Sequence, residues 1–282
     1  MRIYDTHMHS AWSQPADPKR LIASLEETGI FGACVYSAPP RNDRSEFAEG
    51  GADFEPRLER VLEWCEGYEG RLFPYLWIHP DERGIRKKVK IAAERGIAAF
   101  KLIPYNFHAY EKKNLRLMHE IAEMGKPVIL HAGILWNNSP SARYTQPASY
   151  EALMTVPNLR FALAHCAWPW IDECLALFGK INHVRRTWGR TAEMFIDITP
   201  GTPGFYRRLL FERLYGGVYN ATKHTLLGVD SNANAYNVPY AKGIIERDEA
   251  LYKEFGVSDT VRSLVYEENL FHFLGIQKPE DA

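Results

Sequence analysis

The chain has 282 residues, of which 46% are hydrophobic and 24% are charged, and these proportions predict a globular protein and exclude a long disordered tract. Its 34 basic and 35 acidic residues give a net charge of −1, so we expect a small-molecule substrate and neither nucleic acid nor a membrane as partner. No stretch reaches the roughly 20 apolar residues of a membrane span, and the first predicted strand leaves no room for a secretory leader. We therefore expect a cytoplasmic protein, and its composition leaves a homo-oligomer open.

Short β-branched or aromatic runs alternate along the chain with longer amphipathic runs, which predicts repeated strand–helix units around a parallel sheet. The predicted strands cover residues 3–9, 31–37, 72–79, 97–103, 127–132, 160–165, 194–199 and 225–231. They are apolar almost throughout, as is typical of strands that are covered on both faces. An eight-stranded α/β barrel takes about 250 residues, so we predict a (β/α)8 TIM barrel with residues 1–282 as one domain.

The first predicted helix is the best marked, because Asp17 is an N-cap residue, Pro18 suits the first helical position and Gly29 is a stop signal. Further helices are predicted over residues 53–66, 81–95, 111–124, 205–215 and 261–274. We expect the last of these to close the barrel against the first helix.

Metal-ligand residue types stand at the ends of the predicted strands. His7 and His9 end the first strand, and because a strand alternates its faces both imidazoles point to one side. His131, His165 and Asp230 each follow a short apolar run, at the ends of the fifth, sixth and eighth strands. The carboxyl ends of barrel strands meet at one rim, so we expect these side chains to converge there.

Imidazole and carboxylate are ligands that Zn²⁺, Mn²⁺, Fe²⁺ and Ni²⁺ accept, and three or four of them leave a coordination position open for water. Taken singly, each residue has an ordinary explanation: Asp230 caps a turn, His165 satisfies a backbone group, and Lys101 on the fourth strand extends its amine from the barrel end. Their joint occurrence at successive strand ends favours a metal site.

At these residues the chain resembles the amidohydrolase superfamily, whose signature is His-x-His on strand one, Lys or Glu on strand four, His on strands five and six, and Asp on strand eight. The segments Phe100-Lys101-Leu102, His131-Ala132-Gly133 and 269–275 resemble its amidohydrolase-related branch. This branch contains lactonases, other small hydrolases and decarboxylases akin to aminocarboxymuconate semialdehyde decarboxylase. The similarity covers nearly the entire chain.

The resemblance implies that His7, His9, His131 and Asp230 bind one divalent ion, with Zn²⁺ favoured over Mn²⁺, Fe²⁺ or Ni²⁺. It implies that His165 is either a further ligand or a polarising acid, and that Asp230 also moves a proton. In binuclear relatives a carboxylated lysine at the position of Lys101 bridges a second ion, whereas in mononuclear relatives it contacts substrate or is unused. Because a bare ammonium beside a dication is repelled, Lys101 is carboxylated, deprotonated or aimed elsewhere.

Aromatic and cationic residues follow the predicted strands at the expected mouth of the barrel. If they line a pocket, they favour a small, flat or carboxylated substrate, with an arginine as a bidentate clamp. Arg41 and Arg143 are the candidate clamps, and Tyr105, His108 and Trp136 are further candidate substrate contacts. Trp136 begins the loop after His131, where it can shield the site from water.

Three functional interpretations follow. The first is a metal-dependent hydrolase whose metal-activated water attacks an amide, lactone or ester, and the second is a metal-dependent non-oxidative decarboxylase of a small aromatic or unsaturated acid. The third is a barrel that binds a ligand without catalysis, which the full ligand set disfavours. Within the resemblance, a metal-free lactonase is a further alternative, whereas a deoxyribonuclease is disfavoured because its relatives carry Glu where this chain has Lys101.

Overall fold

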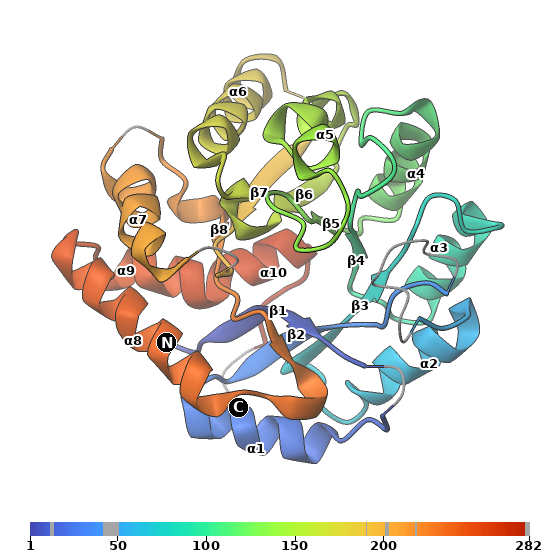
Figure 1. The fold of residues 1–282 in the computed structure, drawn as a ribbon, viewed down its shortest axis with the longest axis horizontal. Coiled ribbons are helices and arrows are strands. Elements are labelled where there is room, and N and C mark those ends of the chain that lie inside the picture. Colours follow the sequence, from blue (N-terminus) through green and yellow to red (C-terminus); the bar gives the residue numbers. More distant parts are fainter. Residues whose placement is uncertain (12–13, 42–50, 190, 201–202, 218, 280–282) are drawn as a thin grey trace.

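A computed structural model describes residues 1–11, 14–41, 51–189, 191–200, 203–217 and 219–279 of the chain. It confirms the predicted (β/α)8 barrel, with strands around the centre and helices outside them (Figure 1). All strand pairs are parallel, in the order β8-β7-β6-β5-β4-β3-β2-β1-β9. The strands of the described residues are β1 (Tyr4–His9), β2 (Gly32–Tyr36), β3 (Leu72–Trp77), β4 (Ala99–Leu102), β5 (Val128–Leu130), β6 (Arg160–Leu163), β7 (Glu193–Asp197), β8 (Thr225–Leu226) and β9 (Ser231–Asn232).

The last barrel position departs from the prediction, because the single strand expected over 225–231 is broken into β8 and β9. β8 pairs with β7, and β9 pairs with β1. Between them, the Thr6 amide donates to the Leu227 carbonyl (2.9 Å) and the Asp230 amide donates to the His7 carbonyl (2.9 Å). The segment from 225 to 232 therefore closes the barrel between β7 and β1.

Two residues explain the break. Asp230 has a left-handed backbone with φ of +62°, which ends a regular strand. Gly228 lies so close to its neighbours that a Cβ there would overlap the Thr199 hydroxyl and stand 2.7 Å from the Cβ of His7. Because Gly228 has no side chain, this segment packs closely against β1 and the end of β7. This close packing places Asp230 beside His7.

The helices of the described residues surround the sheet, and the first begins and ends as predicted. The Asp17 carboxylate accepts a hydrogen bond from the Arg20 amide (3.0 Å), and Gly29 is left-handed with φ of +76°. Three of the helices, the short α5 and the longer α6 and α8, were not predicted. The helices are α1 (Pro18–Thr28), α2 (Phe54–Glu63), α3 (Ile85–Glu94), α4 (Lys112–Glu123), α5 (Ser141–Tyr144), α6 (Ile171–Trp188), α7 (Arg207–Tyr215), α8 (Val238–Glu254), α9 (Asp259–Ser263) and α10 (Asn269–Leu274).

The C-terminal helical segment does not close the barrel against the first helix, so that prediction is wrong. α8 packs beside α1 instead. α10 lies under the barrel, where Phe271 meets Tyr4 edge-on (5.4 Å between ring centroids) and Phe273 meets Phe195 (5.1 Å). These rings fill the amino-terminal end of the barrel interior.

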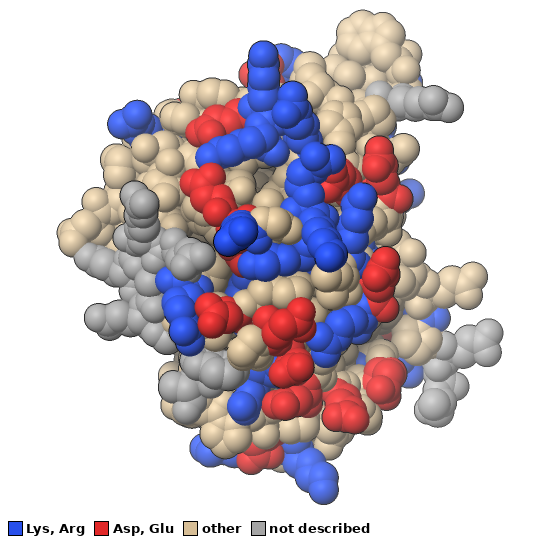
Figure 2. Space-filling view, turned by 90° about the vertical axis from the view of Figure 1, so that its right-hand side faces the viewer, with Lys and Arg blue, Asp and Glu red and all other residues tan. Residues whose placement is uncertain are grey.

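Charged side chains of both signs cover the face formed by α2, α3 and α4. Lys and Arg gather near its middle, with Asp and Glu beside and below them (Figure 2). Lys113 pairs with Asp81 (2.6 Å), and Arg86 pairs with Glu120. No helix within the described ranges is both long and apolar enough to cross a membrane.

Candidate metal centre

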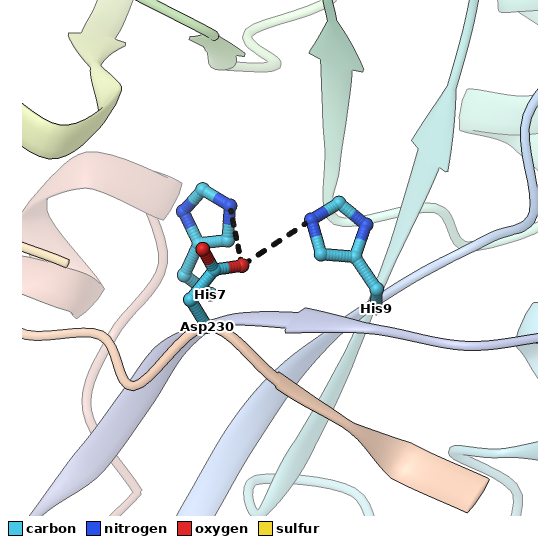
Figure 3. Close-up of side chains that lie close together, drawn as sticks. All are labelled: His7, His9 and Asp230. Carbon is cyan, nitrogen blue, oxygen red and sulfur yellow. Dashed lines mark ion pairs between the residues drawn. The ribbon is translucent and has the colours of Figure 1, made fainter. Parts of the chain in front are cut away.

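Three predicted ligands meet at the carboxyl end of the barrel. His7 and His9 reach it from alternate positions of β1, and Asp230 reaches it from the residue before β9 (Figure 3). Asp230 Oδ1 lies 3.8 Å from His7 Nε2 and 3.6 Å from His9 Nε2, and one ligand atom from each residue lies within 4.8 Å of the other two. Ligands about 2.1 Å from a tetrahedral ion stand roughly 3.4 Å apart. The group therefore fits one divalent cation.

Asp197, at the end of β7, orients His7 from behind. Its Oδ2 lies 2.7 Å from His7 Nδ1, and its Oδ1 accepts hydrogen bonds from the Thr199 amide (2.8 Å) and hydroxyl. The carboxylate is fully buried. Asp197 was not predicted as a site residue, although an acid at the end of an apolar strand is the same signal that identified Asp230.

His165 lies beside the group of three without being part of it. Its ring centroid is 5.2 Å from that of His7, and its Nδ1 lies 3.2 Å from the Thr199 carbonyl oxygen. A carbonyl oxygen only accepts, so Nδ1 carries the hydrogen and a neutral ring has its lone pair on Nε2. His165 has a left-handed backbone with φ of +58°, as do Cys166 and Ala167 after it, a strained conformation of the kind that clusters at functional sites.

His131 also lies near the group but outside it. Its ring centroid is 5.0 Å from that of His165, and its Nε2 lies 3.1 Å from the Ile134 carbonyl oxygen. Here the carbonyl places the hydrogen on Nε2 and leaves the lone pair on Nδ1. The predicted role of His131 as a ligand thus requires coordination through Nδ1.

The Lys101 side chain points toward the group of three. This excludes one of the three predicted alternatives for Lys101, that its amine is directed away from the cation. Its Nζ is fully buried, 3.4 Å from His7 Nε2 and 5.2 Å from the centroid of the Tyr36 ring. Burial lowers the pKa of Lys101 to about 8. A deprotonated or carboxylated Lys101 remains compatible with a cation at this place.

Burial sets the charge of the ligands. It lowers the pKa of His7 well below its ordinary value and that of His9 to about 4, so both imidazoles are neutral at pH 7. Burial alone would raise the pKa of Asp230, but the nearby His7, His165 and His9 together lower it. Two neutral imidazoles and a carboxylate are the protonation states that bind metal.

The group opens into a cavity of about 280 Å³. Trp136 is 73% exposed at its mouth, and its ring lies nearly parallel to that of Trp168 (13° between planes, 6.2 Å between centroids). The cavity is lined by His7, His9, Trp77, Ile103, His131, Ile134, Leu135, Trp136, His165, Trp168 and Asp230. Its floor is polar, and its walls are mainly aromatic and aliphatic.

Four predicted substrate contacts are not among these lining residues. Arg41 pairs with Asp53 (3.4 Å) beside a separate groove, and the Arg143 guanidinium lies over the Tyr144 ring. His108 stacks on Tyr110, and Tyr105 is buried behind the wall in a cluster with Trp77, Ile103 and Leu135. The sequence predicts that these four residues follow strands, but it does not predict whether the loops that carry them turn toward the cavity.

Comparison with known proteins gives a match to one family. The profile of a family described as amidohydrolase matches residues 4–217. This range starts at β1 and contains every predicted site residue except Asp230. No curated protein sequence matches the chain.

Solved structures with similar folds include both hydrolases and decarboxylases. A protein described as a probable 2-pyrone-4,6-dicarboxylic acid hydrolase from Acinetobacter baumannii aligns with a TM-score of 0.62 at 12% identity, covering 98% of this chain and 100% of the other. A 2,6-dihydroxybenzoate decarboxylase from Rhizobium aligns with a TM-score of 0.64 at 12% identity, covering 98% and 99%. A dihydroxybenzoic acid decarboxylase from Polaromonas with bound manganese aligns with a TM-score of 0.65 at 10% identity, covering 97% of each chain. At these identities the likeness shows the fold.

Proposed function

The chain belongs to the amidohydrolase family, and from this premise we propose that it is a metal-dependent hydrolase that cleaves a C–N or C–O bond of a small substrate. The amide, lactone or ester would be attacked by a metal-activated water. The observation that carries the proposal is the convergence of His7 Nε2, His9 Nε2 and Asp230 Oδ1 on the floor of a cavity. Zn²⁺ and Mn²⁺ both accept such ligands, and one structural relative is described with bound manganese.

Asp230 and His165 on the floor and Trp136 at the mouth would each have a role in this reaction. A bound divalent cation lowers the pKa of a water from 15.7 to about 7. With the cation held by His7, His9 and Asp230, the Asp230 carboxylate would accept a proton from the activated water and would pass it to the leaving group. His165 polarises the substrate carbonyl only when its Nε2 is protonated, since its Nδ1 hydrogen is directed at Thr199. Trp136 limits the access of bulk water.

A second candidate is non-oxidative decarboxylation, which the cavity walls favour. Trp77, Ile103 and Trp168 surround the space above the polar floor with apolar surface. An aromatic ring packs well against such walls. A substrate carboxylate bound there would lose its solvation, which would destabilise it relative to the uncharged CO₂ that it releases. The loss of CO₂ must be matched by a proton delivered to the ring carbon. His165 protonated on Nε2, or Asp230 after it has accepted a proton from water, would supply that proton.

The experiment is metal analysis of the purified protein, followed by an activity screen after chelation and addition of Zn²⁺ or Mn²⁺. Lactones, amides, esters and aromatic acids are the test substrates, and released CO₂ separates decarboxylation from hydrolysis. We expect His7→Ala and Asp230→Asn each to lower kcat/KM by more than about 100-fold in a folded protein. Turnover retained by both variants would refute the metal mechanism, and no turnover with any substrate would favour the ligand-binding interpretation.

A further inference from the structure

We infer that Asp197 is a positioning residue, which holds His7 in the single ring state that presents Nε2 to a divalent cation. The inference rests on the proposed function, because it concerns how the same centre is held. Strand β7 supplies no member of the group of three, yet Asp197 at its carboxyl end contacts His7, and Thr199 just beyond the strand contacts His165.

The Asp197 carboxylate is fixed by bonds to both of its oxygens. Oδ1 receives the amide and hydroxyl hydrogens of Thr199, and Oδ2 receives the Nδ1 hydrogen of His7 at 2.7 Å. All three residues are buried, so water does not compete for these bonds. The carboxylate therefore cannot rotate without breaking at least one buried hydrogen bond.

This arrangement decides which nitrogen of His7 can bind a cation. An ionised carboxylate only accepts hydrogen bonds, so Nδ1 carries the hydrogen and the lone pair remains on Nε2. Nε2 is the atom that faces Asp230 Oδ1 at 3.8 Å. In the other tautomer a hydrogen would occupy the position that the ion needs. Carboxylate partners of this kind change metal affinity by about 10- to 100-fold when they are removed.

The same strand end also orients His165, but through the main chain. The His165 Nδ1 hydrogen is directed at the carbonyl oxygen of Thr199, which no side-chain substitution removes. Asp197→Asn therefore changes the partner of His7 directly, and it keeps an oxygen that can accept the Thr199 hydrogens and so hold the carbonyl that binds His165. This separation makes Asp197 testable by itself.

The test is a titration of the chelator-stripped protein with Mn²⁺ alone, followed by isothermal calorimetry and electron paramagnetic resonance. We expect Asp197→Asn to weaken Mn²⁺ binding by about 10- to 100-fold without a change in stoichiometry. Glu193→Gln, at the opposite end of β7, is the matched control and should stay within about twofold of the wild type. In ¹⁵N-histidine spectra of the metal-free protein, His7 should be protonated at Nδ1 in the wild type and shift toward Nε2 in Asp197→Asn.

The outcomes separate this inference from the proposed function. Equal Mn²⁺ affinity in the wild type and a folded Asp197→Asn variant would overturn the role of Asp197 and leave the metal centre intact. A wild-type protein that binds neither Mn²⁺ nor Zn²⁺ would overturn the proposed function itself. If Asp197→Asn does not fold, Thr199→Val decides, because it removes only the hydroxyl bond to Oδ1. Weaker Mn²⁺ binding by this variant supports the inference, and unchanged binding contradicts it.

Discussion

The hydrogen-bond partner of each floor histidine determines which of its ring nitrogens can bind a metal ion. Asp197 and the Thr199 carbonyl take the Nδ1 hydrogens of His7 and His165, whereas the Ile134 carbonyl takes the Nε2 hydrogen of His131. A neutral imidazole has one lone pair, so His7 offers Nε2 and His131 offers Nδ1. Two residues of the same type are therefore not equivalent as ligands.

This difference predicts opposite responses to amide substitutions. An asparagine amide ends near the place of a histidine Nδ1, and a glutamine amide ends near that of Nε2. We expect His131→Asn to bind Mn²⁺ about 10-fold more tightly than His131→Gln, and His7→Gln to bind more tightly than His7→Asn. Calorimetric titration of the four proteins measures both ratios. The same order at both positions would show that the hydrogen bonds do not select the ligand atom.

The floor residues could be predicted from the sequence, but of the predicted substrate contacts only Trp136 lines the cavity. His7 and His9 stand at the end of the first predicted strand, and Asp230 follows a short apolar run. A barrel brings the carboxyl ends of its strands together whatever path the loops take. Asp197 carries the same signal, but it was not among the predicted ligands because one acid, Asp230, already completed the expected set. Ile134 and Leu135 are ordinary apolar residues of a loop, and only the tertiary path of that loop places them in the cavity.

At the scale of elements, the segment from β8 to β9 joins barrel closure to the site. Gly228 touches Thr199 and His7, and the Asp230 amide bonds to the His7 carbonyl. Asp5 adds to this junction, because its carboxylate accepts hydrogen bonds from the amides of His7 (3.1 Å) and Val229 (2.8 Å). The break between β8 and β9 could not be predicted from the local sequence, because these contacts come from residues distant in sequence.

Gly228→Ala tests this junction. The added methyl group would overlap the Thr199 hydroxyl and crowd His7, so we expect a loss of about 1–3 kcal/mol in the free energy of unfolding and weaker Mn²⁺ binding. Gly243→Ala is the matched control, since Gly243 lies within α8 and has open space where the methyl group would lie. This control should gain up to about 1 kcal/mol. Urea denaturation measures both values, and equal effects at the two positions would contradict the close approach at Gly228.

The two long helices that were not predicted, α6 and α8, share one feature. α6 contains Gly179 and α8 contains Gly243, and an internal glycine weakens the local preference for a helix by about 1 kcal/mol. Gly179 is explained by packing, because a Cβ there would overlap the Tyr219 ring. Both helices owe their stability to burial against the barrel, which a local pattern does not report.

Across the whole molecule, the candidate metal centre and α10 lie at opposite ends of the barrel. The candidate centre occupies the carboxyl ends of the strands, and α10 fills the amino-terminal end. There the buried Glu193, first residue of β7, accepts from His224 Nε2 (3.1 Å) and lies 3.2 Å from His272 Nε2 on α10. Arg185 lies 3.3 Å from its other oxygen. This ion cluster attaches the C-terminal helix to the sheet.

The cluster predicts a loss of stability in acid that spares the metal centre. Burial alone would raise the pKa of Glu193, but its histidine and arginine partners lower it far below the ordinary 4.5. A depressed carboxyl pKa stabilises the fold above about pH 4.5, and this contribution declines as the pH falls further. We expect Glu193→Gln to lower the free energy of unfolding by about 2 kcal/mol at pH 7, and the difference from the wild type to shrink steadily below pH 4.5. Urea denaturation at a series of pH values measures the difference, and Mn²⁺ titration at pH 7 should find the variant unchanged. A difference that is independent of pH would show that the ionised carboxylate is not what holds α10 in place.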